Sequence, residues 1–97
     1  MRHEVLVKVL KAIIELLEKY RQEIASLSEK DKLLLMKHGI SLGIQDFRFT
    51  TKAIVKKTGL HEKTVYFYLK ALETSGILIN YRRKWFFNPK LIELFSG

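Results

Sequence analysis

The chain has 97 residues, no cysteine, and 18 Lys and Arg against 10 Asp and Glu, which gives a formal net charge of +8. This length favours one domain with a modest core, the missing cysteines exclude a disulfide framework and thiolate chemistry, and the positive charge favours a polyanionic partner. No stretch approaches the ~20 apolar residues of a membrane span, and Lys8 and Lys11 interrupt the apolar N-terminus, so we expect no signal peptide and a cytoplasmic location.

The first 27 residues contain an apolar seam with a heptad repeat. Its members follow one another at alternating spacings of four and three: Leu6, Leu10, Ile13, Leu17, Tyr20, Ile24 and Leu27. The positions beside the seam are also apolar in the first half of this segment: Val7, Val9, Ile14 and Leu16. An apolar arc this wide indicates a helix that packs against several others, from its own domain and from a partner chain.

We therefore predict that residues 1–27 form a dimerisation helix, because exposing a second apolar arc in a monomer would be costly. The predicted dimerisation residues are Leu6, Leu10, Ile13, Leu17, Tyr20 and Ile24. The alternative is that this helix simply folds over its own domain.

The next segment predicts a second helix and a short strand. Ser28, with Asp31 three residues later, resembles a capping box and predicts a helix through the apolar residues 33–36. Gly39 or Gly43 would end that helix. Residues 40–46 have no clear period and are expected to form a loop or a frayed helix end, whereas residues 47–49 alternate and favour a short strand.

Two short helices are predicted after residue 49. Thr50 or Thr51 caps a helix over about residues 51–58, and Gly59 ends it. A further helix covers residues 62–75, and its inward stripe consists of apolar residues at helical spacing: Val65, Leu69 and Leu72. Residues 77–81 and 85–87 then alternate as the two strands of a hairpin with a turn at 81–84, and Pro89 starts a last helical turn.

The corner between these two helices has the residue types of a helix-turn-helix. A compact residue, a glycine four positions later and a β-branched residue six beyond that are found at Val55, Gly59 and Val65. Gly59 can adopt a positive φ without strain from a Cβ atom. Such a corner packs the second helix back on the first.

Residues 58–78, TGLHEKTVYFYLKALETSGIL, are similar to the turn, recognition helix and first wing strand of winged helix-turn-helix transcriptional regulators of prokaryotic, archaeal or archaeal-virus type. The resemblance covers about residues 28–95. It implies an α+β, mostly helical fold, with a DNA-binding domain over residues 28–97 and a two- to three-stranded wing sheet. It does not reach the extra N-terminal helix at 1–27, which the heptad seam predicts. His61 stands where Ser is usual, and residues 66–68 are aromatic where polar base-reading residues are common.

The charge distribution agrees with DNA binding by the second half of the chain. Residues 1–46 hold eight Lys and Arg against seven Asp and Glu, whereas residues 47–97 hold ten against three, a net of +7. Lysines on the two helices can meet phosphates, Tyr66 can hydrogen-bond a phosphate or base edge, and the basic hairpin tip can enter a minor groove. Phe67 either contacts a thymine methyl or packs in a dimer contact. The predicted DNA-binding residues are Lys52, Lys56, Lys57, His61, Lys63, Thr64, Tyr66, Phe67, Lys70, Arg82, Arg83 and Lys84.

These patterns predict a sequence-specific protein that binds double-stranded DNA as a homodimer and regulates transcription. The alternatives are an architectural DNA-binding protein with low sequence specificity, or a winged-helix module that binds protein in a transcription or replication assembly. We expect no enzyme activity, cofactor, metal or small-molecule ligand. His3, His38 and His61 lack metal-ligand spacing, and no glycine-rich phosphate loop is present.

Overall fold

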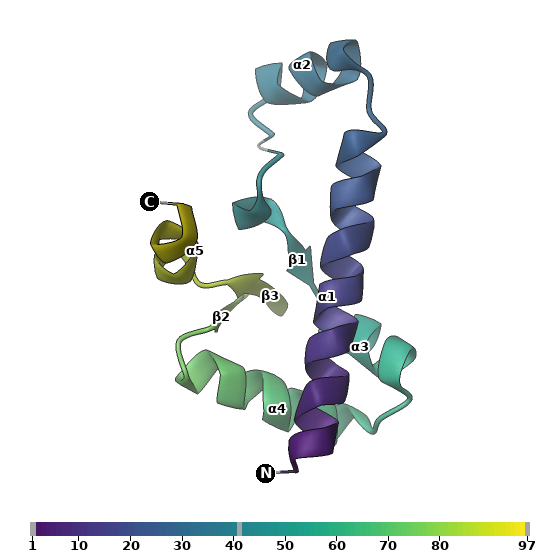
Figure 1. Ribbon diagram of the computed structural model, residues 1–97, viewed down its shortest axis with the longest axis vertical. Helices are drawn as coiled ribbons and strands as arrows, with labels where there is room; N and C mark the ends of the chain where they lie inside the picture. Colours follow the sequence, from purple (N-terminus) through teal and green to yellow (C-terminus); the bar gives the residue numbers. More distant parts are fainter. Residues whose placement is uncertain (1, 41, 97) are drawn as a thin grey trace.

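The computed structural model describes residues 2–40 and 42–96, with side chains up to Leu94 (Figure 1). The predicted α+β, mostly helical fold is confirmed, and its elements follow one another in the predicted order. They are α1 (His3–Ala25), α2 (Glu29–Lys37), the 3-10 helix η1 (Ile44–Asp46), β1 (Arg48–Phe49), α3 (Thr51–Thr58), α4 (Glu62–Thr74), β2 (Leu78–Tyr81), β3 (Lys84–Phe87) and α5 (Pro89–Ser96).

The three strands form an antiparallel sheet in the order β1-β3-β2. The register sets Trp85 of β3 between Phe49 of β1 and Asn80 of β2. Because residues paired directly across two strands have their side chains on the same face, Trp85 and Phe49 point to one face of the sheet, and both are buried. The sheet therefore contributes one apolar face to the core, while Arg48 and Tyr81 are exposed.

The corner between α3 and α4 forms as its residues dictate. The Thr50 hydroxyl accepts a hydrogen bond from the Ala53 N–H at 3.2 Å and caps α3. Gly59 ends α3 with a φ of 71°, in the left-handed region that favours glycine. His61 caps α4 through its ring, because Nδ1 accepts from the Lys63 N–H at 3.2 Å. A ring nitrogen thus takes the place of the serine hydroxyl expected at this position.

One core joins α1 to the rest of the fold. Val9, Ala12 and Ile13 of α1 are buried together with the inner residues of α3, α4 and the sheet. Helix α1 therefore contacts both α3 and α4 (Figure 1). The N-terminal helix and the segment after residue 46 fold around the same apolar centre.

Much of the predicted dimerisation seam lies against this core. Ile13 is only 3% exposed, so its side chain is not free for a partner. The chain's own core also packs against four further residues of the seam: Leu6, Leu10, Leu17 and Tyr20. Most of the seam therefore packs against the chain's own core, although Leu6, Leu10, Leu17 and Tyr20 are only partly buried.

Tyr20 is held at the end of this core near η1. Its hydroxyl donates to the Gly43 carbonyl at 3.2 Å, and its ring lies 5.6 Å from the ring of Phe47. Burial, followed by the nearby Asp46 carboxylate, raises the pKa of Tyr20 above its ordinary value of 10.0, while Arg48 opposes the shift. Tyr20 therefore ties α1 to the segment that leads into the sheet.

Helix α2 lies apart from the core, beyond the C-terminal end of α1 (Figure 1). The Ser28 hydroxyl accepts from the Asp31 N–H at 3.1 Å and begins the helix as predicted, and Gly39 follows its end with a φ of 78°. No described residue of α2 is buried. Three of its large apolar side chains, Leu33, Leu34 and Met36, are exposed, while Leu35 is half-buried.

Candidate nucleic-acid interface

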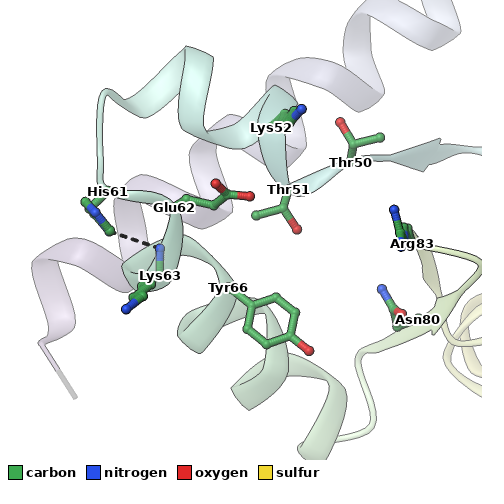
Figure 2. A pocket seen from close by; sticks show the side chains of 9 residues that line it. All are labelled: Thr50, Thr51, Lys52, His61, Glu62, Lys63, Tyr66, Asn80 and Arg83. Carbon is green, nitrogen blue, oxygen red and sulfur yellow. Dashed lines mark hydrogen bonds between the residues drawn. The ribbon is translucent and has the colours of Figure 1, made fainter.

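A groove of about 840 Å3 opens where the first turns of α3 and α4 approach the β2–β3 hairpin (Figure 2). Each of these three elements contributes part of the lining. The lining residues are Thr50, Thr51, Lys52, His61, Glu62, Lys63, Tyr66, Asn80 and Arg83. Segments that are far apart in the sequence therefore share one concave surface.

Two helix N-termini face this groove. The first turn of α3 contributes Thr51 and Lys52, and the first turn of α4 contributes Glu62 and Lys63. The first turn of a helix presents backbone N–H groups and the positive end of the helix dipole. Both features favour an anion such as a phosphate group.

The side-chain charges of the groove add to this preference. Lys52, Lys63 and Arg83 are cationic and exposed, while Glu62 is the one acidic side chain among the nine described lining residues. Figure 2 shows Lys52, Lys63 and Arg83 around the groove, each from a different element. A concave surface lined mainly by cations focuses a positive field and attracts a polyanion such as a nucleic-acid backbone.

Trp85 and Thr51 hold the sheet against α3 behind the groove. The Trp85 indole N–H donates to the Thr51 hydroxyl at 3.0 Å, and Trp85 is 1% exposed. The ring of Tyr66 stands edge-on to Trp85 at 6.1 Å between centroids. These contacts set the spacing between α3, α4 and the hairpin, and hence the width of the groove.

The hairpin tip is a two-residue turn formed by Arg82 and Arg83. Tyr81 pairs with Lys84 across the turn, and the φ angles of the two arginines are 51° and 66°. Two-residue hairpins favour such positive φ values, but Asn and Gly usually occupy them. Arginine in this region costs about 1–2 kcal/mol per residue. The guanidinium of Arg82 lies over the ring of Tyr81, 5.2 Å from its centroid.

Of the twelve residues predicted to bind DNA, the groove brings five together. These are Lys52, His61, Lys63, Tyr66 and Arg83. Arg82 and Lys84 adjoin Arg83 at the exposed hairpin tip. Lys56 is exposed and Thr64 half-buried, and both lie outside the lining of the groove.

Three predicted residues have other contacts. The Lys57 ammonium lies 3.0 Å from the Glu15 carboxylate and ties α3 to α1. The Lys70 ammonium lies 2.6 Å from the Glu73 carboxylate, and this hydrogen bond raises the pKa of Lys70 and lowers that of Glu73. Phe67 is 57% exposed and stands edge-on to the ring of Tyr68.

Four groove residues were not predicted to contact a ligand: Thr50, Thr51, Glu62 and Asn80. The two threonines were recognised only as candidate caps. Asn80 reaches the groove because the hairpin register sets it opposite Trp85, and its N–H donates to Glu73 of α4 at 3.2 Å. The position of Asn80 in the groove depends on this pairing with a distant strand, and the residues next to Asn80 in the sequence do not reveal it.

No family model matches this chain. No curated protein and no solved structure matches it either. Among the described residues, no helix combines the length and the apolar character that a membrane span needs. Nor do three or more His, Cys, Asp or Glu side chains of the described residues come together in a way that suits a metal ion.

Proposed function

We propose that this chain is a winged helix-turn-helix protein that binds specific sites on double-stranded DNA as a homodimer and regulates transcription. The observation that supports this proposal is the groove in which two helix N-termini and an arginine hairpin meet. Its chemistry suits the phosphate backbone of a duplex, and backbone contacts position a protein on DNA.

In this proposal α4 is the recognition helix. Exposed side chains follow its length: Glu62, Lys63, Tyr66, Phe67 and Lys70. A helix of this kind fits the major groove, where bases present distinct patterns of donors and acceptors. The first turn of α3 then lies against the backbone, and the hairpin tip reaches the adjacent minor groove, whose negative potential favours arginine.

The decisive experiment is DNA selection followed by binding measurements. Selection from a random duplex pool should yield a preferred sequence. Affinity for that sequence should exceed affinity for random duplex by about 10³-fold or more, and both affinities should fall with salt. Enrichment of no sequence would contradict a sequence-specific regulator.

The hairpin is tested by the double substitution Arg82→Ala with Arg83→Ala. We expect affinity for the selected duplex to fall by at least about tenfold, because two proposed contacts with the minor groove of DNA would be lost. The matched control is Lys30→Ala with Lys37→Ala, which removes two exposed positive charges from α2. Equal losses for the two variants would mean that only net charge matters and that the hairpin has no special position on DNA.

An architectural protein with low sequence specificity is the second candidate, favoured by the exposed rings of Tyr66 and Phe67 on α4. Aromatic and basic side chains without a polar base-reading set suit contact with many sequences. The same selection separates the two candidates. An architectural protein would give a specificity ratio near one together with a steep dependence on salt.

A further inference from the structure

A second apolar stripe runs along α1 beside its buried face. Val7 is 38% exposed and Ile14 is 51% exposed, and three partly exposed residues continue the pattern. We call this set the α1 stripe: Val7, Leu10, Ile14, Leu17 and Ile24. Its members follow heptad spacing, with Arg21 at the one position of the repeat that is not apolar. This is the pattern of a helix that pairs with another helix.

The α1 stripe is rotated relative to the seam that the sequence predicts. Ile13 and Tyr20 of that seam turn towards the core, whereas Val7 and Ile14, which flank the seam, face solvent. Leu10 and Leu17 lie at the boundary between the two faces. Exposed apolar side chains that line up along one helix face are typical of an interaction site.

Charges along one edge of the α1 stripe indicate what covers it. Lys11 and Glu18 each follow a leucine of the stripe, and their separation of seven residues puts them on the same edge. Both are exposed. Within the described residues, neither has an ion-pair partner.

An antiparallel pair of identical helices brings these two charges together. A two-fold axis perpendicular to the helices apposes the same edge of both helices and reverses their direction. With the axis near Ile14, residue 11 of one helix falls opposite residue 18 of the other. Lys11 of each copy then faces Glu18 of the other copy, which gives two equivalent charge pairs. A parallel pair would instead set equivalent residues at the same height.

We propose that a second copy of this chain docks its α1 antiparallel on the α1 stripe, with reciprocal pairs between Lys11 and Glu18. This inference rests on the homodimer part of the proposed function and names the surface that forms the dimer. It shifts the predicted contact to one side of the seam: Leu10, Leu17 and Ile24 belong to both sets, while the exposed Val7 and Ile14 replace the residues that turn towards the core.

The apolar contact is tested by Ile14→Lys in the full chain, without DNA. Sedimentation equilibrium of the unaltered protein should give a dimer, and Ile14→Lys should raise the dissociation constant by about 100-fold or more, because the charge would lie at the centre of the interface. The matched control is Leu94→Lys on α5, since Leu94 is exposed but lies outside the stripe. This control should remain as dimeric as the unaltered protein.

The direction of pairing is tested by charge reversal. Lys11→Glu and Glu18→Lys should each weaken the dimer by about three- to tenfold, because each creates two like-charge contacts. Lys8→Glu, which makes the same charge change at an exposed position of α1 away from the stripe, should not. An equimolar mixture of the Lys11→Glu and Glu18→Lys chains should recover dimers, since opposite charges then meet at both contacts.

Each outcome decides a different point. An unaltered chain that stays monomeric at micromolar concentration overturns this inference together with the homodimer. A dimer that Ile14→Lys leaves intact overturns the inference alone. If the mixed chains stay as weakly associated as each variant by itself, the antiparallel pairing is wrong. None of these measurements involves DNA, so a failure of DNA binding would show separately.

Discussion

Glu62 lies in the groove among side chains that would attract phosphate. It belongs to the first turn of α4, where a carboxylate interacts favourably with the helix dipole. The same carboxylate would repel a DNA backbone in the groove. This residue therefore favours the free protein and opposes the proposed complex.

Substituting Glu62→Gln should tighten DNA binding by about two- to fivefold at low salt, which corresponds to an exposed charge contact. The gain should shrink as salt rises. The matched control is Glu93→Gln on α5, which changes the net charge equally outside the groove. Fluorescence anisotropy with a labelled duplex measures the DNA affinity of both variants. Equal gains in affinity would show that the duplex does not occupy the groove.

Tyr20 should make the free energy of unfolding depend on pH in the alkaline range. Its pKa is raised in the folded state, first by burial, so its contribution to stability is present below the ordinary value of 10.0. That contribution disappears as the pH rises through the folded pKa. Tyr20→Phe should be less stable near neutral pH, because it loses the bond to Gly43, but should lose less further stability above pH 10. Urea unfolding across this range measures the difference, and parallel curves would contradict it.

At the scale of elements, the corner between α3 and α4 depends on local chemistry. Gly59 ends α3 with a positive φ, and a Cβ atom added there would meet nothing within 4 Å. The requirement for glycine is therefore conformational and does not arise from crowding.

Gly59→Ala should lower the free energy of unfolding by about 1 kcal/mol, since the strain of alanine at this φ exceeds its advantage in the unfolded chain. Gly59→Asn should lose less, because Asn tolerates the left-handed region better. Denaturant titration of both variants tests the order. A loss for Gly59→Asn equal to or larger than that for Gly59→Ala would contradict a purely conformational requirement for glycine.

The sequence predicted this part of the fold well, because each signal lies next to its effect. Thr50, Gly59 and Pro89 mark helix ends within a residue of where the structure has them. The orientation of α1 depended on distant residues. Its apolar arc includes two neighbouring stripes, and only contact with α3 and α4 decides which is buried. Likewise, the groove needed the hairpin register to bring Asn80 and Arg83 to the two helix starts.

At the scale of the molecule, the groove and the α1 stripe lie on different elements and make separate demands. The groove uses α3, α4 and the hairpin, while the α1 stripe uses α1 alone. A two-fold dimer would offer DNA two such grooves, suited to a near-palindromic site with half-sites ~34 Å apart.

Ile14→Lys should therefore affect full sites more than half-sites. The variant should bind an isolated half-site about as well as the unaltered chain does. Its affinity for the full palindrome should fall by about 100-fold, because the two half-sites are then no longer bound by one linked dimer. Titrations of both duplexes test this. Equal losses on half-sites and full sites would indicate that the substitution damages the DNA-binding surface itself.

The turn at Arg82 and Arg83 implies a trade-off between folding and recognition. Replacing the pair by Asn and Gly, which suit positive φ, should raise the thermal unfolding midpoint while weakening DNA binding. A protein selected for stability alone would be expected to discard two arginines from such positions. In the proposed complex, the two arginines at the hairpin tip would therefore raise the affinity for DNA while lowering the thermal stability of the fold.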